Sequence, residues 1–166
     1  MPNEAHFRKL ENMYRHAESS IYHESTMTIT GEGRAEVVIP VREDFYHGAK
    51  AVHGSVYFKA LDEAAFFAVN SLVEETFVLT ANFNIYLLRP ITEGVMRAVG
   101  QVVHHTRTQF IAESVLYDGD GNMLARGSGT FVRGKTPLSP AINYELPGDS
   151  GGSGGEPSGA GGAGGT

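Results

Sequence analysis

The chain has 166 residues, a length typical of one domain, with 41% hydrophobic residues and a formal net charge of -6. This acidic balance argues against a nucleic-acid-binding protein, although a few arginines would suffice to hold a phosphate-bearing ligand. The absence of cysteine excludes disulfides, thiolate metal sites and a cysteine nucleophile. The first residues lack the apolar core of a signal peptide, and no run of about 18 apolar residues follows, so we expect a cytoplasmic protein without membrane contact.

The first part of the chain is predicted to form a helix and then a hairpin of two strands. Residues 1–19 form the helical segment, which we expect to pack on the domain, over a sheet edge or a pocket mouth. Apolar side chains recur there at helical spacing, at Phe7, Leu10, Met13, Tyr14 and Ala17. Residues 21–30 and 34–41 flank a glycine turn and indicate the hairpin. Residues 42–54 lack a clean period and are expected to be an ordered loop.

The central feature is a long, mostly apolar helix predicted over residues 55–72, with Ser55 as its N-cap. Asp62 and Glu63 lie in its middle, and carboxylates are rarely buried unless they are paired or functional. Adjacent helix residues point about 100° apart, so both acids can hardly face one pocket. We expect one acid in a half-buried site and the other at a rim. The alternative is a solvated helix face on which Lys59 pairs with the acids.

Four strands are predicted after this helix, at residues 77–88, 94–105, 108–117 and 123–133. The hairpin, the helix and this meander indicate an α+β fold, in which an antiparallel β-sheet wraps around one long central helix. The main domain is expected to span residues 20–134, followed by an exit segment at 135–146. Residues 147–166 are mostly Gly, Ser and Ala, and we expect them to form a disordered tail.

The start of the central helix offers a place for negative charge. Free N–H groups and the helix dipole favour an anion or a polarised carbonyl oxygen there. Gly54 lets a ligand approach the backbone closely, so its N–H is a candidate oxyanion donor. The alternative is an ordinary turn glycine that precedes a helix.

His53, Gly54 and Ser55 precede an apolar helix in which Asp62 follows nine residues after the histidine. Together with the run AFFAVNS, the strand end YLLRP and the last hairpin from residue 120 to residue 130, this pattern resembles the PaaI-like hotdog-fold acyl-CoA thioesterases. The resemblance covers residues 20–134. It implies a hotdog fold and hydrolysis of an acyl-CoA thioester to free acid and CoA. CoA would then be part of the substrate, and no separate cofactor is expected.

The resemblance also implies roles for individual residues. Asp62 would be the nucleophile or general base, and the Gly54 N–H would polarise the thioester carbonyl. Thr80 stands where relatives often place a Ser or Thr that orients the water or the acid. His53 would shape the loop and help to hold the carbonyl.

The chain departs from the family pattern at two positions. Ser55 replaces the second glycine of the motif, and His47 replaces an Asn that often lies six residues before the motif histidine. His47 is still able to donate a hydrogen bond to the substrate carbonyl, although its protonation depends on pH. These departures affect how the carbonyl is activated more than which acid reacts.

Helix geometry predicts that the site is shared between two chains. Gly54 and Asp62 are eight residues apart, which corresponds to about 12 Å along one helix. A reacting carbonyl needs both a donor and a nucleophile within about 3–3.5 Å. Two antiparallel helices across a twofold axis meet this need, so we expect a homodimer with two shared sites, or a dimer of dimers.

The phosphates of CoA need positively charged partners. Arg107, in the turn between two strands, is the leading candidate because relatives often use that turn at the nucleotide end, and Arg89 is the second. Each is otherwise an ordinary solvated charge. His47 and His53 lie near each other in sequence but lack an obvious third ligand, so no metal is expected.

Two other functions compete with thioester hydrolysis. A hotdog enoyl-CoA hydratase or dehydratase would need a carboxylate and histidine pair, for which His53 and Asp62 are candidates. A non-catalytic acyl-CoA-binding protein would bind without turnover. Aromatic residues near the proposed site (Tyr57, Phe58, Phe66 and Phe67) suit an aryl or medium acyl chain, but any core would contain them too.

Overall fold

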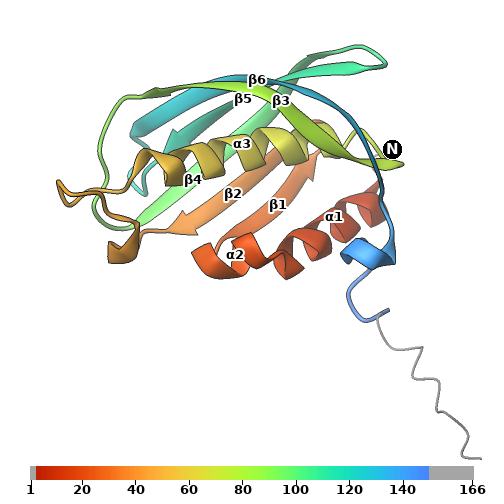
Figure 1. Cartoon of the computed structure of the whole chain (residues 1–166), viewed down its shortest axis with the longest axis horizontal. Helices are drawn as coiled ribbons and strands as arrows, with labels where there is room; N and C mark the ends of the chain where they lie inside the picture. Colours follow the sequence, from red (N-terminus) through yellow and green to blue (C-terminus); the bar gives the residue numbers. More distant parts are fainter. Residues whose placement is uncertain (1–2, 150–166) are drawn as a thin grey trace, which may run out of the picture.

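The computed structural model describes residues 3–149 and shows an antiparallel sheet of six strands that curves around one long helix (Figure 1). In chain order the elements are α1 (Glu4–His16), α2 (Glu18–His23), β1 (Thr26–Gly31), β2 (Arg34–Pro40), η1 (Glu43–Phe45), α3 (Gly54–Asn70), β3 (Thr76–Leu87), β4 (Val95–His105), β5 (Gln109–Tyr117), β6 (Met123–Pro137) and η2 (Pro140–Ile142). This arrangement confirms the predicted α+β fold. The predicted tail falls mostly on residues 150–166, which lie outside the described residues.

The strand order of the sheet is β1-β2-β4-β5-β6-β3. The predicted meander after the helix is therefore wrong in one respect, because β3 pairs with β6 and not with β4. β2 of the first hairpin pairs with β4 instead, in register from Arg34 opposite Gln101 to Pro40 opposite Val95. The first strand after the helix thus crosses to the far edge of the sheet, and β1 and β3 become the two edge strands.

Two local predictions near the helices are wrong. Residues 21–23 belong to α2 and not to a strand, since Ala17 adopts an extended backbone that ends α1 and a new helical turn begins at Glu18. The N-cap of α3 is His53 and not Ser55, because the His53 Nδ1 accepts a hydrogen bond from the Ser55 N–H at 3.0 Å. Helix α3 consequently begins at Gly54.

Helix α3 lies in the concave face of the sheet, and eleven of its seventeen residues are buried. Small residues on the helix and the sheet let the two approach closely. A Cβ on Gly100 of β4 would lie only 2.1 Å from the Ala64 carbonyl oxygen. The Ser114 hydroxyl on β5 donates to the Leu61 carbonyl at 2.7 Å, which ties the helix to the sheet. Within residues 3–149, no helix is long and apolar enough to cross a membrane.

The two sheet edges differ in how their backbone groups are satisfied. Helix α1 covers the β1 edge: the Glu11 carboxylate accepts from the Ile29 N–H at 2.8 Å, and Arg8 donates to the Ile29 carbonyl. Edge strands that are capped in this way are protected from pairing with another chain. The outer edge of β3 has no paired strand among the described residues, and Tyr86 and Leu87 at its end are more than half exposed.

The Gly100 contact predicts a large effect of one methyl group. Gly100→Ala should lower the free energy of unfolding by about 3 kcal/mol, because the new Cβ would push α3 away from β4. Urea unfolding followed by circular dichroism measures this. Gly31→Ala is the matched control, since a Cβ on this strand glycine would meet no atom within 4 Å. Equal unfolding midpoints for the two variants would contradict the close helix–sheet packing.

Candidate active site

Asp62 projects from the middle of α3 toward β3. The Thr80 hydroxyl donates to Asp62 Oδ1 at 2.9 Å, while Oδ2 has no bonded partner among residues 3–149. Burial raises the pKa of Asp62, and the Thr80 hydrogen bond partly opposes this rise. The negative charge of Glu63 raises this pKa further, and the positive charge of Lys59 lowers it. Asp62 is thus held by one oxygen and keeps the other available for chemistry.

Glu63, the neighbouring acid, lies in different surroundings. The Lys59 ammonium donates to its Oε1, and the Tyr14 hydroxyl donates to its Oε2 at 2.9 Å. The Lys59 and Glu63 side chains are only 13% and 18% exposed, so this pair is largely removed from water. Burial, with a further contribution from the Glu63 charge, raises the pKa of the Tyr14 hydroxyl. Glu63 therefore pairs with α1 and Lys59, which leaves Asp62 as the acid of the two with an oxygen unpartnered among residues 3–149.

A cavity of about 230 Å³ opens beside these two acids. Its walls come from α1, α2, α3 and the start of β3, and apart from the acids and Ser19 they are apolar or aromatic. The lining residues are Met13, Tyr14, Ala17, Ser19, Asp62, Glu63, Phe66, Phe67 and Phe77. A carboxylate in an apolar cavity is typical of catalytic acids and bases.

Gly54 is the first residue of α3 and lies at a second cavity. The next two N–H groups of the helix are satisfied by His53, through its Nδ1 and its carbonyl oxygen. Within the described part of the chain the Gly54 N–H has no acceptor, and it carries the positive end of the helix dipole. The cavity measures about 290 Å³ and is lined by His47, Val52, Gly54, Tyr57, Leu87, Leu88, Arg89 and Pro90.

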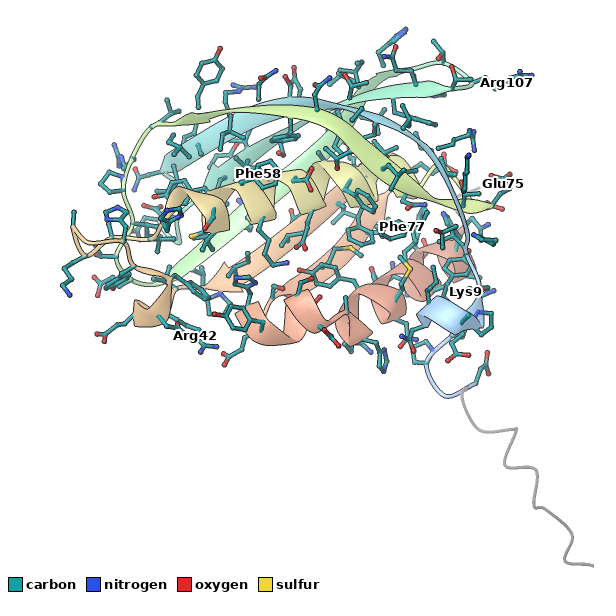
Figure 2. The ribbon with its side chains drawn as sticks, in the orientation of Figure 1. Lys9, Arg42, Phe58, Glu75, Phe77 and Arg107 are labelled. Atoms are coloured by element: carbon teal, nitrogen blue, oxygen red, sulfur yellow. The ribbon has the colours of Figure 1, made fainter. Side chains whose placement is uncertain are left out.

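The other predicted site residues divide between these surroundings. His47 and Arg89 line the Gly54 cavity. His53 is exposed and serves as the helix cap, with its ring centroid 6.5 Å from that of His47. Arg107 is exposed at the turn between β4 and β5 and lines neither cavity (Figure 2). Its carbonyl oxygen accepts from the Arg133 side chain at 2.9 Å.

Within one chain the predicted site is therefore in two halves. One half brings together Asp62 and Thr80, and the other brings together Gly54, His47 and Arg89. Gly54 and Asp62 line different cavities, as two residues eight positions apart on one straight helix must.

The sequence did not single out Tyr14, Met13 and Phe77 as parts of the Asp62 cavity. The apolar stripe of the first helix, which contains Met13 and Tyr14, predicted packing over a sheet edge or a pocket mouth but did not identify the pocket. Of the aromatic residues proposed near the site, Phe66 and Phe67 line the Asp62 cavity, and Tyr57 lines the Gly54 cavity.

Phe58 lies in neither cavity and instead packs its ring against that of Phe83, with centroids 5.8 Å apart. For the described residues, no group of three or more His, Cys, Asp or Glu side chains is placed to hold a metal ion.

Known sequences provide the first comparison. The family model of the thioesterase superfamily matches residues 49–125, which include Gly54, Asp62, Thr80 and Arg89 but not His47. A curated Saccharolobus solfataricus protein named "Putative esterase" is 32% identical over 81 residues, and this match covers 49% of the chain. The chain spans about half of that relative, 54% of its length. A "Putative esterase" of Sulfurisphaera tokodaii is 26% identical over 100 residues, which cover 60% of this chain and 74% of that protein.

Solved structures with the same fold agree. The PaaI protein of the E. coli phenylacetic acid degradation operon superposes with a TM-score of 0.76 at 19% identity, over 84% of this chain and all of that one. A thioesterase family protein from Silicibacter pomeroyi superposes with a TM-score of 0.68 at 24% identity, over 75% of this chain and 95% of that one. At these identities the likeness establishes the fold, and the predicted hotdog fold is confirmed. The chain therefore has the hotdog fold, and its residues 49–125 are similar to the thioesterase superfamily.

Proposed function

We propose that this protein is an acyl-CoA thioesterase that hydrolyses its substrate to a free acid and CoA. The observation that carries the proposal is Asp62, a carboxylate with one oxygen held by Thr80 and the other open to an apolar cavity. Its raised pKa makes it a stronger base than an exposed aspartate while it remains ionisable. The match of residues 49–125 to the thioesterase superfamily supports hydrolase chemistry in general.

Asp62 has two chemically balanced routes to hydrolysis. As a nucleophile, it attacks the thioester carbon, the C–S bond breaks, and CoA leaves as a thiolate that takes up a proton. Water then hydrolyses the mixed anhydride and releases the acid. As a general base, Asp62 instead removes a proton from the water that attacks the same carbon, and this proton passes to the thiolate. Both routes build negative charge on the carbonyl oxygen, which the free Gly54 N–H would stabilise.

The proposed site is completed by a second copy of the chain. The open β3 edge, with Leu79, Tyr86 and Leu87 exposed, is available for strand pairing, whereas α1 covers the β1 edge. Antiparallel pairing of two such edges would set the α3 helices side by side in opposite directions. Gly54 of each copy would then approach Asp62 of the other, and a single carbonyl would meet both groups.

The phosphates of an acyl-CoA need a positively charged side chain near the two halves of the site. Arg89 lines the Gly54 cavity, so we assign it to the CoA phosphates in preference to Arg107, which lies outside both cavities. The hydratase alternative needs a histidine beside the carboxylate. Among residues 3–149, no histidine lines the Asp62 cavity, so a hydratase would need a histidine of the second copy, such as the His47 that lines the Gly54 cavity.

Asp62→Asn should reduce kcat/KM for acyl-CoA by about 10²–10⁴-fold, because the amide is neither a base nor a nucleophile. Thiol release assayed with a chromogenic disulfide measures this. Asp120→Asn, the same change in an exposed turn, is the control and should leave turnover intact. Full activity of the Asp62→Asn variant would refute the mechanism.

The pH dependence of kcat/KM should report the ionisation of Asp62. The reactive form is the carboxylate, so activity should fall as the pH drops through a pKa above that of an ordinary aspartate. Thr80→Val removes the hydrogen bond that lowers this pKa, so its acid limb should move to higher pH. An unmoved acid limb in Thr80→Val would argue against Asp62 as the titrating group.

Gly54→Pro tests the proposed backbone donor directly. Proline is well tolerated at the first residue of a helix, and His53 already has the extended backbone that precedes proline, so α3 should be kept while the N–H is lost. We expect kcat to fall by about 10²–10³-fold. Gly54→Ala keeps the N–H and adds a Cβ 3.0 Å from the end of Leu87, so it should retain more activity than Gly54→Pro. The reverse order would exclude the N–H as the donor.

Mixing two inactive variants tests whether the site is shared. A heterodimer of Asp62→Asn and Gly54→Pro chains contains one site with both native groups and one with neither. Unfolding and refolding an equal mixture should therefore restore about one quarter of wild-type turnover, because half of the dimers gain one of two sites. A mixture as inactive as its parents, despite heterodimers detected by mass spectrometry, would show that each site lies within one chain.

A further inference from the structure

A second hollow along α1 shares part of its wall with the Asp62 cavity. This hollow, here called the α1 groove, measures about 390 Å³ and is lined by Met13, Ala17, Phe77, Thr136, Ile142 and Asn143. Three of these residues, Met13, Ala17 and Phe77, also line the Asp62 cavity. Figure 2 shows Phe77 in the space between β3 and α1. The Asp62 cavity alone is small for a ligand, but together the hollows reach the usual range of about 300–1,000 Å³.

The chemistry of these walls favours an uncharged, apolar occupant. The side chains shared by the two hollows are apolar, and Glu63 already has Lys59 and Tyr14 as partners. A polar or charged acyl group would lose its hydration there and find few hydrogen-bond partners. An alkyl chain would bury its surface at no such cost.

The groove is also held in shape before any ligand arrives. Tyr14 fixes α1 to Glu63, and the buried His6 ring bridges the Asn70 carbonyl at 2.8 Å and the Tyr144 hydroxyl at 2.6 Å. These contacts tie α1 to the end of α3 and to the segment that carries Ile142. Binding to a preformed site carries only a small free-energy cost for ordering the protein.

Two other occupants of the groove are less suitable. Residues 150–166 contain only Ser, Gly, Glu, Pro, Ala and Thr, so this part of the chain has no large apolar side chain with which to fill it. A second copy of the chain would pair through the β3 edge, and of the residues that line the groove only Phe77 lies on β3.

We propose that α1 determines acyl specificity, and that the preferred substrate is an acyl-CoA with an unbranched alkyl chain. In this assignment the thioester carbon lies at Asp62, and the chain runs past Phe77, Met13 and Ala17 toward Ile142. The inference rests on the proposed thioesterase function. Each methylene buried in the groove should raise kcat/KM by about fourfold until the groove is full.

Ala17→Trp tests this assignment, because residue 17 lies where the two hollows meet and is only partly buried. The ratio of kcat/KM for lauroyl-CoA to that for acetyl-CoA should fall at least tenfold. Ala5→Trp is the matched control, since Ala5 is exposed on the same helix and lines neither hollow, and it should leave this ratio unchanged. Ile142→Trp, at the far end of the groove, should lower the ratio of palmitoyl-CoA to hexanoyl-CoA and serves if Ala17→Trp does not fold.

The outcomes separate this inference from the proposed function. Hydrolysis with unchanged ratios in folded Ala17→Trp and Ile142→Trp would leave the thioesterase assignment standing and overturn the groove. If the wild type hydrolyses no acyl-CoA, dodecyl-CoA, a thioether that cannot be hydrolysed, tests the groove by calorimetry. Binding weakened at least tenfold by Ala17→Trp but not by Ala5→Trp would support the groove without catalysis, and equal binding would overturn it.

Discussion

The constraint on which the rest of this structure depends is the straightness of α3. A buried helix packed at backbone distance against Gly100 cannot bend without losing its contact with the sheet. It holds Gly54 and Asp62 about 12 Å apart, and both are groups that one carbonyl would need. The separation explains why the two residues line different cavities. In the proposed dimer, the β3 edge, which has no paired strand among residues 3–149, would bring a second helix alongside, whereas α1 covers the β1 edge.

Helix α1 does more than cover a sheet edge. Through Tyr14 it binds Glu63, and so helps to keep the acid next to Asp62 paired in a place where water is scarce. An unpaired second carboxylate there would disfavour ionisation of Asp62 even more strongly than burial and the paired Glu63 already do. The same helix lines the Asp62 cavity through Met13 and Ala17. One element thus influences both the charge of the site and the room beside it.

The sequence predicted the helices and strands whose signal lies in local residue patterns. It did not predict features that depend on contacts between distant parts of the chain. The bounds of α3 and of most strands follow from apolar periodicity, and the pairing of Asp62 with Thr80 follows from the family resemblance together with strand position. Residues 21–23 were wrongly predicted as a strand. The extended backbone at Ala17 ends α1, and a second helix, α2, begins directly after it and includes these residues. The pairing of β3 with β6 joins residues some fifty positions apart, and no local pattern contains that information. For the same reason, the stripe on α1 predicted a helix but not a wall of the Asp62 cavity.

The residues around the Asp62 cavity come from elements that differ in how well they tolerate substitution. Asp62 and Thr80 sit on α3 and β3, where buried neighbours and close backbone contacts oppose most substitutions. Ala17 follows the end of α1 and is partly exposed. Its hydrogen bonds, to Tyr14 and Ser20, are made by its backbone and not by its side chain. A larger side chain there would shorten the space beside Asp62 while leaving the Asp62–Thr80 hydrogen bond in place. In the proposed thioesterase, reaction and acyl preference would then be separable, because the first would depend on the packed core and the second on a helix laid against it.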